Sequence, residues 1–331
     1  MRATARAHPN IALVKYWGKR DAPLNLPSAG SLSVTLGGLS TTTTVTFDET
    51  LSGDELVLDG DVLTEGRALE RVSTFLDLLR QAAGLDLAAR VETANDFPTA
   101  AGLASSASGF AALAVAATAA AGLDWSPRQL SVLARRGSGS AARSLFGGYV
   151  EMNPGTRDDG TDAHATPIAS PEHWDLRCLI ALTTTGAKKV GSTEGMVRTQ
   201  KTSPLFQPWI DTQTDDLARA RRAIEGRDFH ALAAIAERSC LRMHATALGA
   251  DPGILYWNGT TVELIHGVRR LRDEGLDCFF TIDAGPHVKV FCTPDQVDEL
   301  RSALDRVEGV RGVVEAHPGP GASVLDDPRE S

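Results

Sequence analysis

Small residues and serines crowd residues 95–109, which read NDFPTAAGLASSASG and lead into an alanine-rich segment at 110–121 that is typical of a helix. Ser105, Ser106 and Ser108 are residues that favour helix starts. The first turn of a helix offers unpaired backbone N–H groups and the positive end of the helix dipole, so this stretch could bind a phosphate group. It matches neither the Walker A pattern nor GxGxxG. The alternative is a core helix that serine merely caps.

Residues 10–21 read NIALVKYWGKRD and place cations beside two aromatic rings. The apolar run that ends at residue 14 is expected to be a short buried strand. The ammonium groups of Lys15 and Lys19 and the hydroxyl of Tyr16 suit the oxygens of a phosphate. The alternative is a solvated loop in which these charges face water.

Residues 135–148 read RRGSGSAARSLFGG and form a second small-residue segment ahead of a helix. Residues 138–140 could donate backbone and hydroxyl hydrogen bonds, and the planar guanidinium of Arg143 suits a carboxylate or a phosphate. Further along, an apolar strand predicted at 278–282 ends in Asp283, beside a Gly-Pro turn. This acid could act on a substrate, or it could only cap the turn.

The composition limits the possible functions. A chain of 331 residues is long enough for two domains that share a cleft. The net charge of −9 argues against a nucleic-acid-binding surface. The four cysteines are far apart and form no CxxC, which predicts a reduced, cytoplasmic chain without structural zinc. The longest apolar run, near 110–123, is too short to span a bilayer, and residues 1–6 lead into no secretory signal core.

The elements that must position these residues follow from the periodicity of the sequence. The expected strands are 11–14, the later half of 24–36, 41–47, 87–93, 147–151, 177–183, 278–282, 288–292 and 313–314. The expected helices are 66–83, 110–121, one that starts at Ser126-Pro127, 211–225, 229–248, 262–273 and 295–306. Asp59-Gly60 predicts a hairpin turn. Residues 153–173 are expected to form a charged loop, and the tail from Pro318 a mobile end.

Five stretches together resemble the signatures of the diphosphomevalonate decarboxylase family, which belongs to the GHMP kinase superfamily. They are NIALVKYWGKRD at 10–21, NDFPTAAGLASSASG at 95–109, RRGSGSAARSLFGG at 135–148, GSTEGM at 191–196 and TIDAGP at 281–286. The stretches occur in the family's order. The resemblance spans nearly the whole chain, about residues 3–325.

The resemblance implies a fold and a reaction. The implied fold is α+β and two-lobed, with a ribosomal-protein S5 domain 2-like lobe at residues 1–178, a ferredoxin-like α/β sandwich lobe at 179–331, and the active site in the cleft between them. The implied reaction converts ATP and mevalonate 5-diphosphate, with Mg2+, into isopentenyl diphosphate, CO2, ADP and phosphate. A tertiary hydroxyl leaves poorly, so the 3-hydroxyl is phosphorylated first. The family is often a homodimer, and no nucleic-acid or membrane partner is expected.

The resemblance also implies roles for individual residues. Asp283 would orient or deprotonate the 3-hydroxyl, Lys15 would offset phosphate charge, and Arg143 would hold the substrate carboxylate. The implied substrate contacts are Tyr16, Trp17, Gly18, Lys19, Ser138, Gly139, Ser140, Ala141, Ala142, Arg143, Ser192 and Met196. The implied ATP contacts are Ala101, Gly102, Leu103, Ala104, Ser105, Ser106, Ser108 and Lys188, with Ser106 also a candidate Mg2+ ligand.

Three positions depart from the family pattern and leave the exact substrate open. Residues 28–30 are Ser-Ala-Gly where the family often has an asparagine pair or Asn-Ser, His287 stands where asparagine is usual, and Thr193 stands where some members carry arginine. The alternatives are a decarboxylase of mevalonate 5-phosphate, a mevalonate 3-kinase, and a catalytically inactive binding protein of the same fold. The presence of the acid, lysine and arginine named above argues against the last two.

Overall fold

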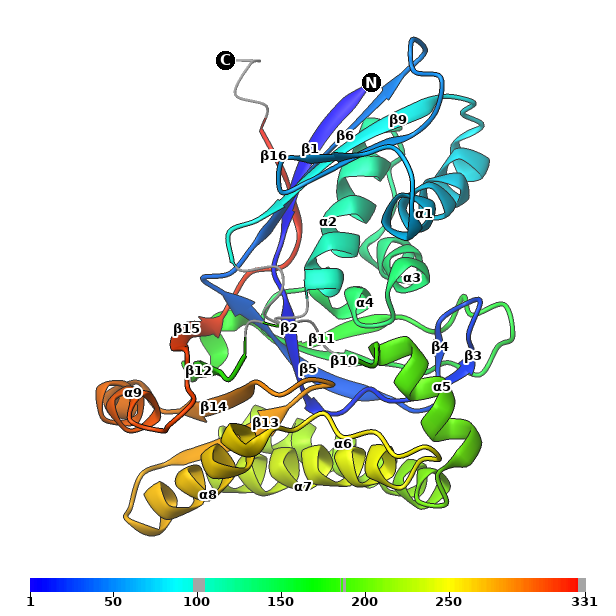
Figure 1. The fold of residues 1–331 in the computed structure, drawn as a ribbon. Coiled ribbons are helices and arrows are strands. Elements are labelled where there is room, and N and C mark those ends of the chain that lie inside the picture. The colour runs from blue at the N-terminus through cyan, green and yellow to red at the C-terminus, as the bar shows by residue number, and fades with distance from the viewer. Residues whose placement is uncertain (98–104, 185, 187–188, 327–331) are drawn as a thin grey trace.

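The computed structural model describes residues 1–97, 105–184, 186 and 189–326 and contains two lobes of α+β structure (Figure 1). In these residues the first lobe is built on a six-stranded sheet of order β16-β1-β6-β9-β7-β8. Its strands are β1 (Arg2–Ala7), β6 (Thr41–Asp48), β7 (Glu55–Leu58), β8 (Asp61–Leu63), β9 (Ala88–Asn95) and β16 (Ser323–Leu325). Asp59 and Gly60, both with positive φ, form the predicted hairpin turn between β7 and β8.

One face of this sheet is covered by helices. Side chains of β6 alternate between buried and partly exposed, as the β-branched sequence predicts. α2 (Ser105–Ala120) packs on the buried face, where its alanines allow the helix to lie close to the strands (Figure 1). α1 (Arg67–Ala83) and α3 (Pro127–Gly137) complete this layer. Ser126 caps α3 in a capping box and Pro127 occupies its first turn, as predicted.

A second sheet continues from the first lobe into the second. In the described residues its order is β11-β10-β5-β15-β12-β14-β13, and β2 also pairs with β5. The strands are β2 (Asn10–Val14), β5 (Ser31–Gly37), β10 (Tyr149–Met152), β11 (Ala165–Ala169), β12 (Arg177–Leu182), β13 (Cys278–Ile282), β14 (Val288–Cys292) and β15 (Gly312–Pro318). β15 pairs with both β5 and β12, so it joins the two lobes by backbone hydrogen bonds.

Helices cover the second lobe at the end opposite the six-stranded sheet (Figure 1). α6 (Phe206–Gly226), α7 (Phe229–Leu248) and α8 (Gly259–Asp273) lie at that end, and α5 (Ser192–Thr202) and α9 (Val297–Asp305) lie at the sides of the lobe. α6 and α7 lie side by side, and α7 also packs against β13 and β2. Shorter pieces are α4 (Ala141–Ser144), the hairpin β3 (Lys19–Asp21) with β4 (Leu26–Pro27), and 3₁₀ turns at Pro171–His173 and Pro294–Gln296.

Two of the expectations for irregular chain are wrong. The charged loop expected at 153–173 contains β11, which pairs with β10. β11 is an edge strand with Pro167 in it, and such a strand shows no apolar alternation that would reveal it. The tail expected to be mobile from Pro318 instead contains β16, whose Leu325 pairs with Thr4 of β1. β11 forms by pairing with the preceding strand across the loop, and β16 by pairing with the strand at the other end of the chain. The local sequence of neither strand encodes this pairing.

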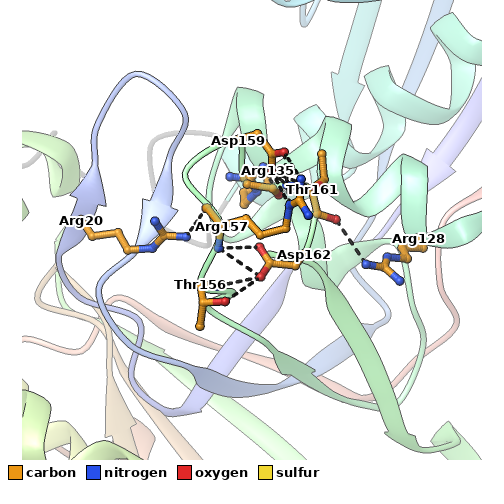
Figure 2. Close-up of polar contacts among 9 residues, drawn as sticks. Arg20, Arg128, Arg135, Thr156, Arg157, Asp159, Thr161 and Asp162 are labelled. Carbon is orange, nitrogen blue, oxygen red and sulfur yellow. Dashed lines mark hydrogen bonds and ion pairs between the residues drawn. The ribbon is translucent and has the colours of Figure 1, made fainter.

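The remainder of the charged loop is held by its own carboxylates (Figure 2). Asp162 accepts hydrogen bonds from backbone N–H groups at the start of the loop, and Asp159 accepts others near its end. The buried Arg135 donates to Gly160 O at 3.0 Å and to Leu24 O at 2.7 Å. The loop and the β3–β4 hairpin are therefore fastened to one guanidinium at the end of α3.

Candidate active site

A cleft of about 1150 Å3 is lined by residues from both lobes. Among the described residues, seven lysine and arginine side chains line it, against three carboxylates. The cations are Lys15, Lys19, Arg67, Arg71, Arg136, Arg143 and Lys189, and the carboxylates are Glu70, Glu194 and Asp283. A chain with a net charge of −9 thus gathers positive charge in one place, as the binding of a polyanionic ligand requires.

An ion pair joins the two lobes at the base of this cleft. Lys15 follows the end of β2 and Asp283 follows the end of β13, and Lys15 Nζ lies 2.6 Å from Asp283 Oδ1. Burial alone would raise the pKa of Asp283, but Lys15, Lys289 and Arg143 outweigh it and lower that pKa to about 2. The carboxylate is therefore ionised at neutral pH and is a weak proton acceptor.

The backbone that carries Asp283 is held by α7. Cys240 accepts a hydrogen bond from Ile282 N–H at 3.2 Å, and His244 Nε2 donates to Ile282 O at 3.2 Å. Burial lowers the pKa of His244 to about 3, so the imidazole is neutral when it donates this bond. Gly285 N–H donates to Asp283 O at 2.7 Å and closes the turn. These contacts fix the direction in which the carboxylate leaves the strand.

Arg143 is buried with neutral partners. It is 2 % exposed and donates to Ser31 Oγ at 2.6 Å, Ser33 Oγ at 2.9 Å and Asn10 Oδ1 at 3.1 Å. No carboxylate among the residues the structure describes lies within ion-pair distance of it. Burial lowers the pKa of Arg143 to about 10, so it remains charged at neutral pH. A buried cation without a counter-ion is costly, and a bound anion would offset that cost.

Tyr16 lies beside Arg143 and presents an unsatisfied hydroxyl. The Arg143 Cζ atom is 5.8 Å from the centroid of the Tyr16 ring. Within the described part of the chain, the buried Tyr16 hydroxyl has no hydrogen-bond partner. Burial raises its pKa to about 12, so it is a neutral donor. A Cβ atom on Gly139 would lie 2.2 Å from Tyr16 Oη, so glycine is needed there for the ring to fit.

Lys19 lies near the mouth of the cleft. Its ammonium group donates to Asn25 Oδ1 at 2.5 Å and to Thr193 Oγ1 at 3.4 Å. Burial and the neighbouring Arg71 lower the pKa of Lys19 to about 8. Asn25 adopts positive φ and donates from Nδ2 to a backbone oxygen at the end of α3. Arg135 and Asn25 hold the β3–β4 hairpin against α3. In this position Lys19 extends across the cleft toward α5.

The structure brings most of the expected contact residues to one cleft. Those that line it are Lys15, Tyr16, Trp17, Lys19, Ser105, Ser106, Ser138, Gly139, Ser140, Arg143, Ser192, Met196 and Asp283. Gly18 instead packs against Phe206. Ala141 and Ala142 are buried in two hydrophobic clusters, where they fix the turn that carries Arg143. Ser108 is fully buried, with its hydroxyl 2.6 Å from Thr41 Oγ1. Ala101, Gly102, Leu103, Ala104 and Lys188 lie outside the described residues.

The cleft also contains residues that the sequence analysis did not single out. Asn10 opens the motif at 10–21, and it both accepts from Arg143 and donates to Ser140 O at 2.9 Å. Arg67 and Arg71 lie four residues apart on α1, a spacing that puts them on one helix face. That spacing was a signal in the sequence, but only the packing of α1 shows that the face meets the cleft.

Two of the three departures from the family pattern line the cleft. Thr193 does so from α5 and His287 from the turn after Asp283. His287 Nδ1 accepts a hydrogen bond from Thr183 N–H at 3.1 Å, and burial together with Lys289 lowers its pKa to about 4. His287 is therefore a neutral, hydrogen-bonded neighbour of the site. Ser28 packs below the cleft, where its N–H donates to Gly18 O at 3.2 Å.

The fold and the site define a two-lobed α+β enzyme of the GHMP kinase type. Residues 7–165 match the family described as "Diphosphomevalonate decarboxylase-like N-terminal domain". Residues 178–317 match the "Mevalonate 5-diphosphate decarboxylase C-terminal domain". The chain belongs to the diphosphomevalonate decarboxylase family.

Named relatives and solved structures agree with this membership. The chain is 40 % identical to diphosphomevalonate decarboxylase mvd1 of Aspergillus fumigatus, over 99 % of this chain and 83 % of that protein. It is 36 % identical to the human diphosphomevalonate decarboxylase, over 98 % and 94 %. It superposes with a TM-score of 0.92 and 42 % identity on "MDDEF in complex with MVAPP, AMPPCP and Magnesium", over 99 % of each chain. For the mevalonate diphosphate decarboxylase of Staphylococcus aureus the TM-score is 0.93 at 39 % identity, over 98 % of each.

Proposed function

We propose that this protein catalyses the ATP-dependent decarboxylation of mevalonate 5-diphosphate to isopentenyl diphosphate, with release of ADP, phosphate and CO2. Relatives that match nearly the whole chain are named diphosphomevalonate decarboxylase. A similar structure was solved with MVAPP, AMPPCP and magnesium together. The observation that carries the proposal is the meeting of two side chains in one cation-lined cleft. They are a lysine-paired acid, Asp283, and a buried arginine, Arg143, that has no counter-ion among the described residues.

The cleft has separate groups for the two phosphate-bearing molecules. Ser105 and Ser106, the first described residues of α2, line the cleft, so the N-terminal end of this helix supports binding of the ATP phosphates through its positive dipole. Lys19, the Tyr16 hydroxyl and residues 138–140 are the candidates for the substrate diphosphate. We infer that Arg143 binds the substrate carboxylate, because its planar fork matches two carboxylate oxygens.

In this arrangement, phosphate oxygens would be the main ligands of Mg2+. Among the residues the structure describes, no group of three or more His, Cys, Asp or Glu side chains could hold a metal ion. The Ser106 hydroxyl lines the cleft and is an oxygen ligand of the kind that Mg2+ accepts, with ATP phosphates supplying further oxygens. When bound, the ion would neutralise phosphate charge during phosphoryl transfer.

The first step transfers the γ-phosphoryl group of ATP to the 3-hydroxyl. We infer that Asp283 accepts a hydrogen bond from that hydroxyl and orients its oxygen toward phosphorus. The P–O bond to ADP breaks as the new P–O bond forms. Because the pKa of Asp283 is about 2, the carboxylate orients the hydroxyl better than it removes its proton, and the proton ends on the phosphate. Lys15 offsets the negative charge of the transferring group.

The second step removes phosphate and CO2. The C3–O bond breaks with its electron pair leaving on the phosphate, and positive charge develops at C3. The carboxylate of Asp283 would stabilise that charge electrostatically. The C1–C2 bond then breaks, its electrons form the C2=C3 double bond, and CO2 leaves from beside Arg143. An ionised Asp283 serves both steps, which is consistent with the cations that surround it.

The test of the reaction uses three related substrates. Purified protein is incubated with ATP and Mg2+ and, separately, mevalonate, mevalonate 5-phosphate and mevalonate 5-diphosphate, while CO2 and free phosphate are measured. We expect CO2 with the 5-diphosphate only. CO2 with the 5-phosphate would identify the sister decarboxylase, and ADP without CO2 would identify a kinase. No turnover with any of the three would contradict the proposed enzyme activity.

Replacing the acid tests its role within this reaction. We expect Asp283→Ala to abolish CO2 release while ATP affinity stays within about threefold, because the side chain faces the substrate hydroxyl and not the nucleotide. Single-turnover CO2 release and equilibrium nucleotide binding measure the two quantities. A variant with a near-normal rate would remove Asp283 from the mechanism.

We further propose that the protein is a cytoplasmic homodimer divided into lobes at residues 1–178 and 179–331. The four cysteines are unpaired and buried, which suits a reducing compartment. In the described part of the chain, no helix is long and apolar enough to cross a membrane. The separate family matches at 7–165 and 178–317 support the division. Light scattering on the purified protein measures the oligomeric state, and the mass of a monomer would contradict the dimer.

A further inference from the structure

We propose that Lys289 is a positioning residue for the reaction, which holds Asp283 through the carboxylate oxygen that Lys15 does not contact. Lys15 Nζ lies 2.6 Å from Asp283 Oδ1, and Lys289 Nζ lies 3.9 Å from Oδ2. Lys289 stands outside the signature motifs of the chain, and none of the steps described above uses it. The inference rests on the proposed function, since the role of Lys289 is defined through Asp283.

The register of the second sheet explains how Lys289 reaches the acid. Lys289 pairs with Ile180 of β12 on one side and with Thr281 of β13 on the other. Residues directly opposite each other in a sheet point to the same face. Thr281 Oγ1 donates to Ala12 O of β2, so that face is the one that meets β2, whose end leads into Lys15. Both lysines therefore approach Asp283 from the region between β2 and β14.

Lys289 occupies a position where an apolar side chain would be the less costly choice. All five residues of β14 are buried, and the Lys289 side chain is 2 % exposed, against 30 % for Asp283. Apart from Asp283, the partner that the structure gives it is the backbone oxygen of His287 at 3.5 Å. Burial of an ammonium group is costly unless an opposite charge is near. Asp283 is the carboxylate that supplies this charge.

The two lysines differ in what they can contact. Lys15 lines the cleft, so a phosphate bound there would share its charge with Asp283. Lys289 is buried in the sheet and is not among the residues that line the cleft, so its partner is the acid and not a bound phosphate. Burial lowers the pKa of Lys289, and the charge of Asp283 opposes that shift. We infer that Lys289 keeps Asp283 ionised and in place at the stage when Lys15 contacts the transferring phosphate.

Other titratable groups around the pair do not supply a second fixed charge. Arg143 of α4 is the remaining cation that lowers the pKa of Asp283, and it is committed to the substrate carboxylate in the proposed reaction. Burial raises the pKa of Cys178 and, to about 11, that of Cys240, and it lowers those of His244 and His287 to about 3 and about 4. These two cysteines and two histidines are thus neutral at pH 7.

The experiment removes the charge of Lys289 in two shapes, Lys289→Met and Lys289→Gln. We expect either folded variant to lose about tenfold or more in the single-turnover rate of ADP formation at pH 7, with KM for both substrates within about threefold. Loss of one cation raises the pKa of Asp283. The acid limb of the rate should therefore move upward by about one pH unit or more. A residue with a purely structural role would change stability but leave this limb in place.

Matched variants make the result specific. Phe291→Leu perturbs the same buried strand and face without removing charge, and we expect its acid limb to stay within about 0.3 pH units of the wild type. Lys289→Arg keeps the charge, and we expect it to recover part of the rate. A folded neutral variant with a rate within about twofold of the wild type and an unmoved acid limb would overturn the proposal.

A double-mutant cycle keeps the proposal testable if the neutral variants fold poorly. Urea unfolding of the wild type, Asp283→Asn, Lys289→Met and the double variant measures the coupling between the two side chains. We expect Lys289→Met to shift the unfolding midpoint much less, or in the opposite direction, when Asp283 is already neutral. Equal shifts in both backgrounds would overturn the proposal. If wild-type protein releases no CO2, the proposed reaction fails first, which is a separate outcome.

Discussion

The hydrogen-bond partners of Arg143 indicate that its charge is available to a bound anion. A guanidinium that is 2 % exposed usually has a carboxylate beside it, but here its described partners are two serine hydroxyls and an asparagine. These neutral partners fix its plane and leave its charge uncompensated. At the neighbouring ion pair the opposite holds, because Asp283 has more than one cation around it. The proposed substrate carboxylate would offset the charge of Arg143.

The geometry of the guanidinium can be tested by a substitution that keeps its charge. We expect Arg143→Lys to lose about a hundredfold or more in kcat/KM for CO2 release, because one ammonium group cannot reproduce the fork that Ser31 and Ser33 hold in position. Steady-state CO2 release measures this. Arg128→Lys is the control, since Arg128 is exposed and donates to the carbonyl of Thr161 away from the cleft, and its rate should stay within about twofold (Figure 2). A near-normal rate for Arg143→Lys would mean that charge alone suffices.

Lys19 predicts an alkaline limb in the activity profile. Burial lowers its pKa to about 8, so the ammonium group is present below that pH and is lost as pH rises through it. We expect kcat/KM for the diphosphate substrate to fall above pH 8, because this parameter reports groups of the free enzyme. In Lys19→Arg the charge persists at higher pH, so the limb should move upward. An unchanged limb in that variant would assign the titration to another group.

At the scale of elements, the site is made where strands and helices end. Lys15 follows β2, Asp283 follows β13, and the loop between α3 and α4 carries the small residues opposite Tyr16. These ends are held by buried contacts from neighbouring elements, such as those of α7 with Ile282. Side chains placed in this way are aimed by the packing of the elements behind them.

A substitution at Gly139 tests whether its close approach to Tyr16 matters. Gly139→Ala would place a methyl group 2.2 Å from Tyr16 Oη, so the ring or the loop must move. We expect KM for the diphosphate substrate to rise by about tenfold, while the protein still folds, because the displaced groups line the cleft. Gly53→Ala is the control, since nothing lies within 4 Å of a Cβ there. If both variants have the same KM, the approach of Gly139 to Tyr16 does not matter for binding.

At the scale of the whole molecule, the chain closes on itself. β15 joins the two lobes through β5 and β12, and β16 returns to pair with β1 at the far end of the first lobe. The proposed division at residue 178 falls inside β12, which shows that the lobes share one continuous sheet at that point. Relative movement of the lobes about the cleft would therefore have to bend this shared sheet.

The distribution of charge over the molecule also has a measurable consequence. The chain carries a net charge of −9, but the cleft has an excess of cations. We expect kcat/KM for the anionic substrate to fall severalfold as ionic strength rises from about 0.01 to about 0.3 M, because salt screens the attraction to the cleft. Stopped-flow binding at several salt concentrations gives the association rate. A rate that is independent of salt would show that the local positive charge does not guide the substrate.

The sequence by itself determined the family and most elements, and it predicted the side chains that the proposed reaction uses. Helix 229–248 and strands 278–282 and 288–292 were predicted with the bounds that the structure has, because each is long or strongly apolar and bounded by clear turn residues. The strongest site residues were likewise visible as charged or hydroxyl groups in stretches of small residues. These signals depend only on neighbouring residues, so they can be recognised without the tertiary structure.

Only the tertiary structure decided which groups meet. In the sequence Lys289 is one residue of an apolar strand, and only the pairing of β13 with β14 places it near Asp283. Likewise, Asn10 accepts a hydrogen bond from Arg143 because the fold places α4 beside β2. Ser108 resembled its neighbours in the sequence, but the packing of α2 on β6 turned its hydroxyl toward Thr41. These outcomes depend on contacts between residues far apart along the chain, and it is the burial of both sheets that fixes those contacts.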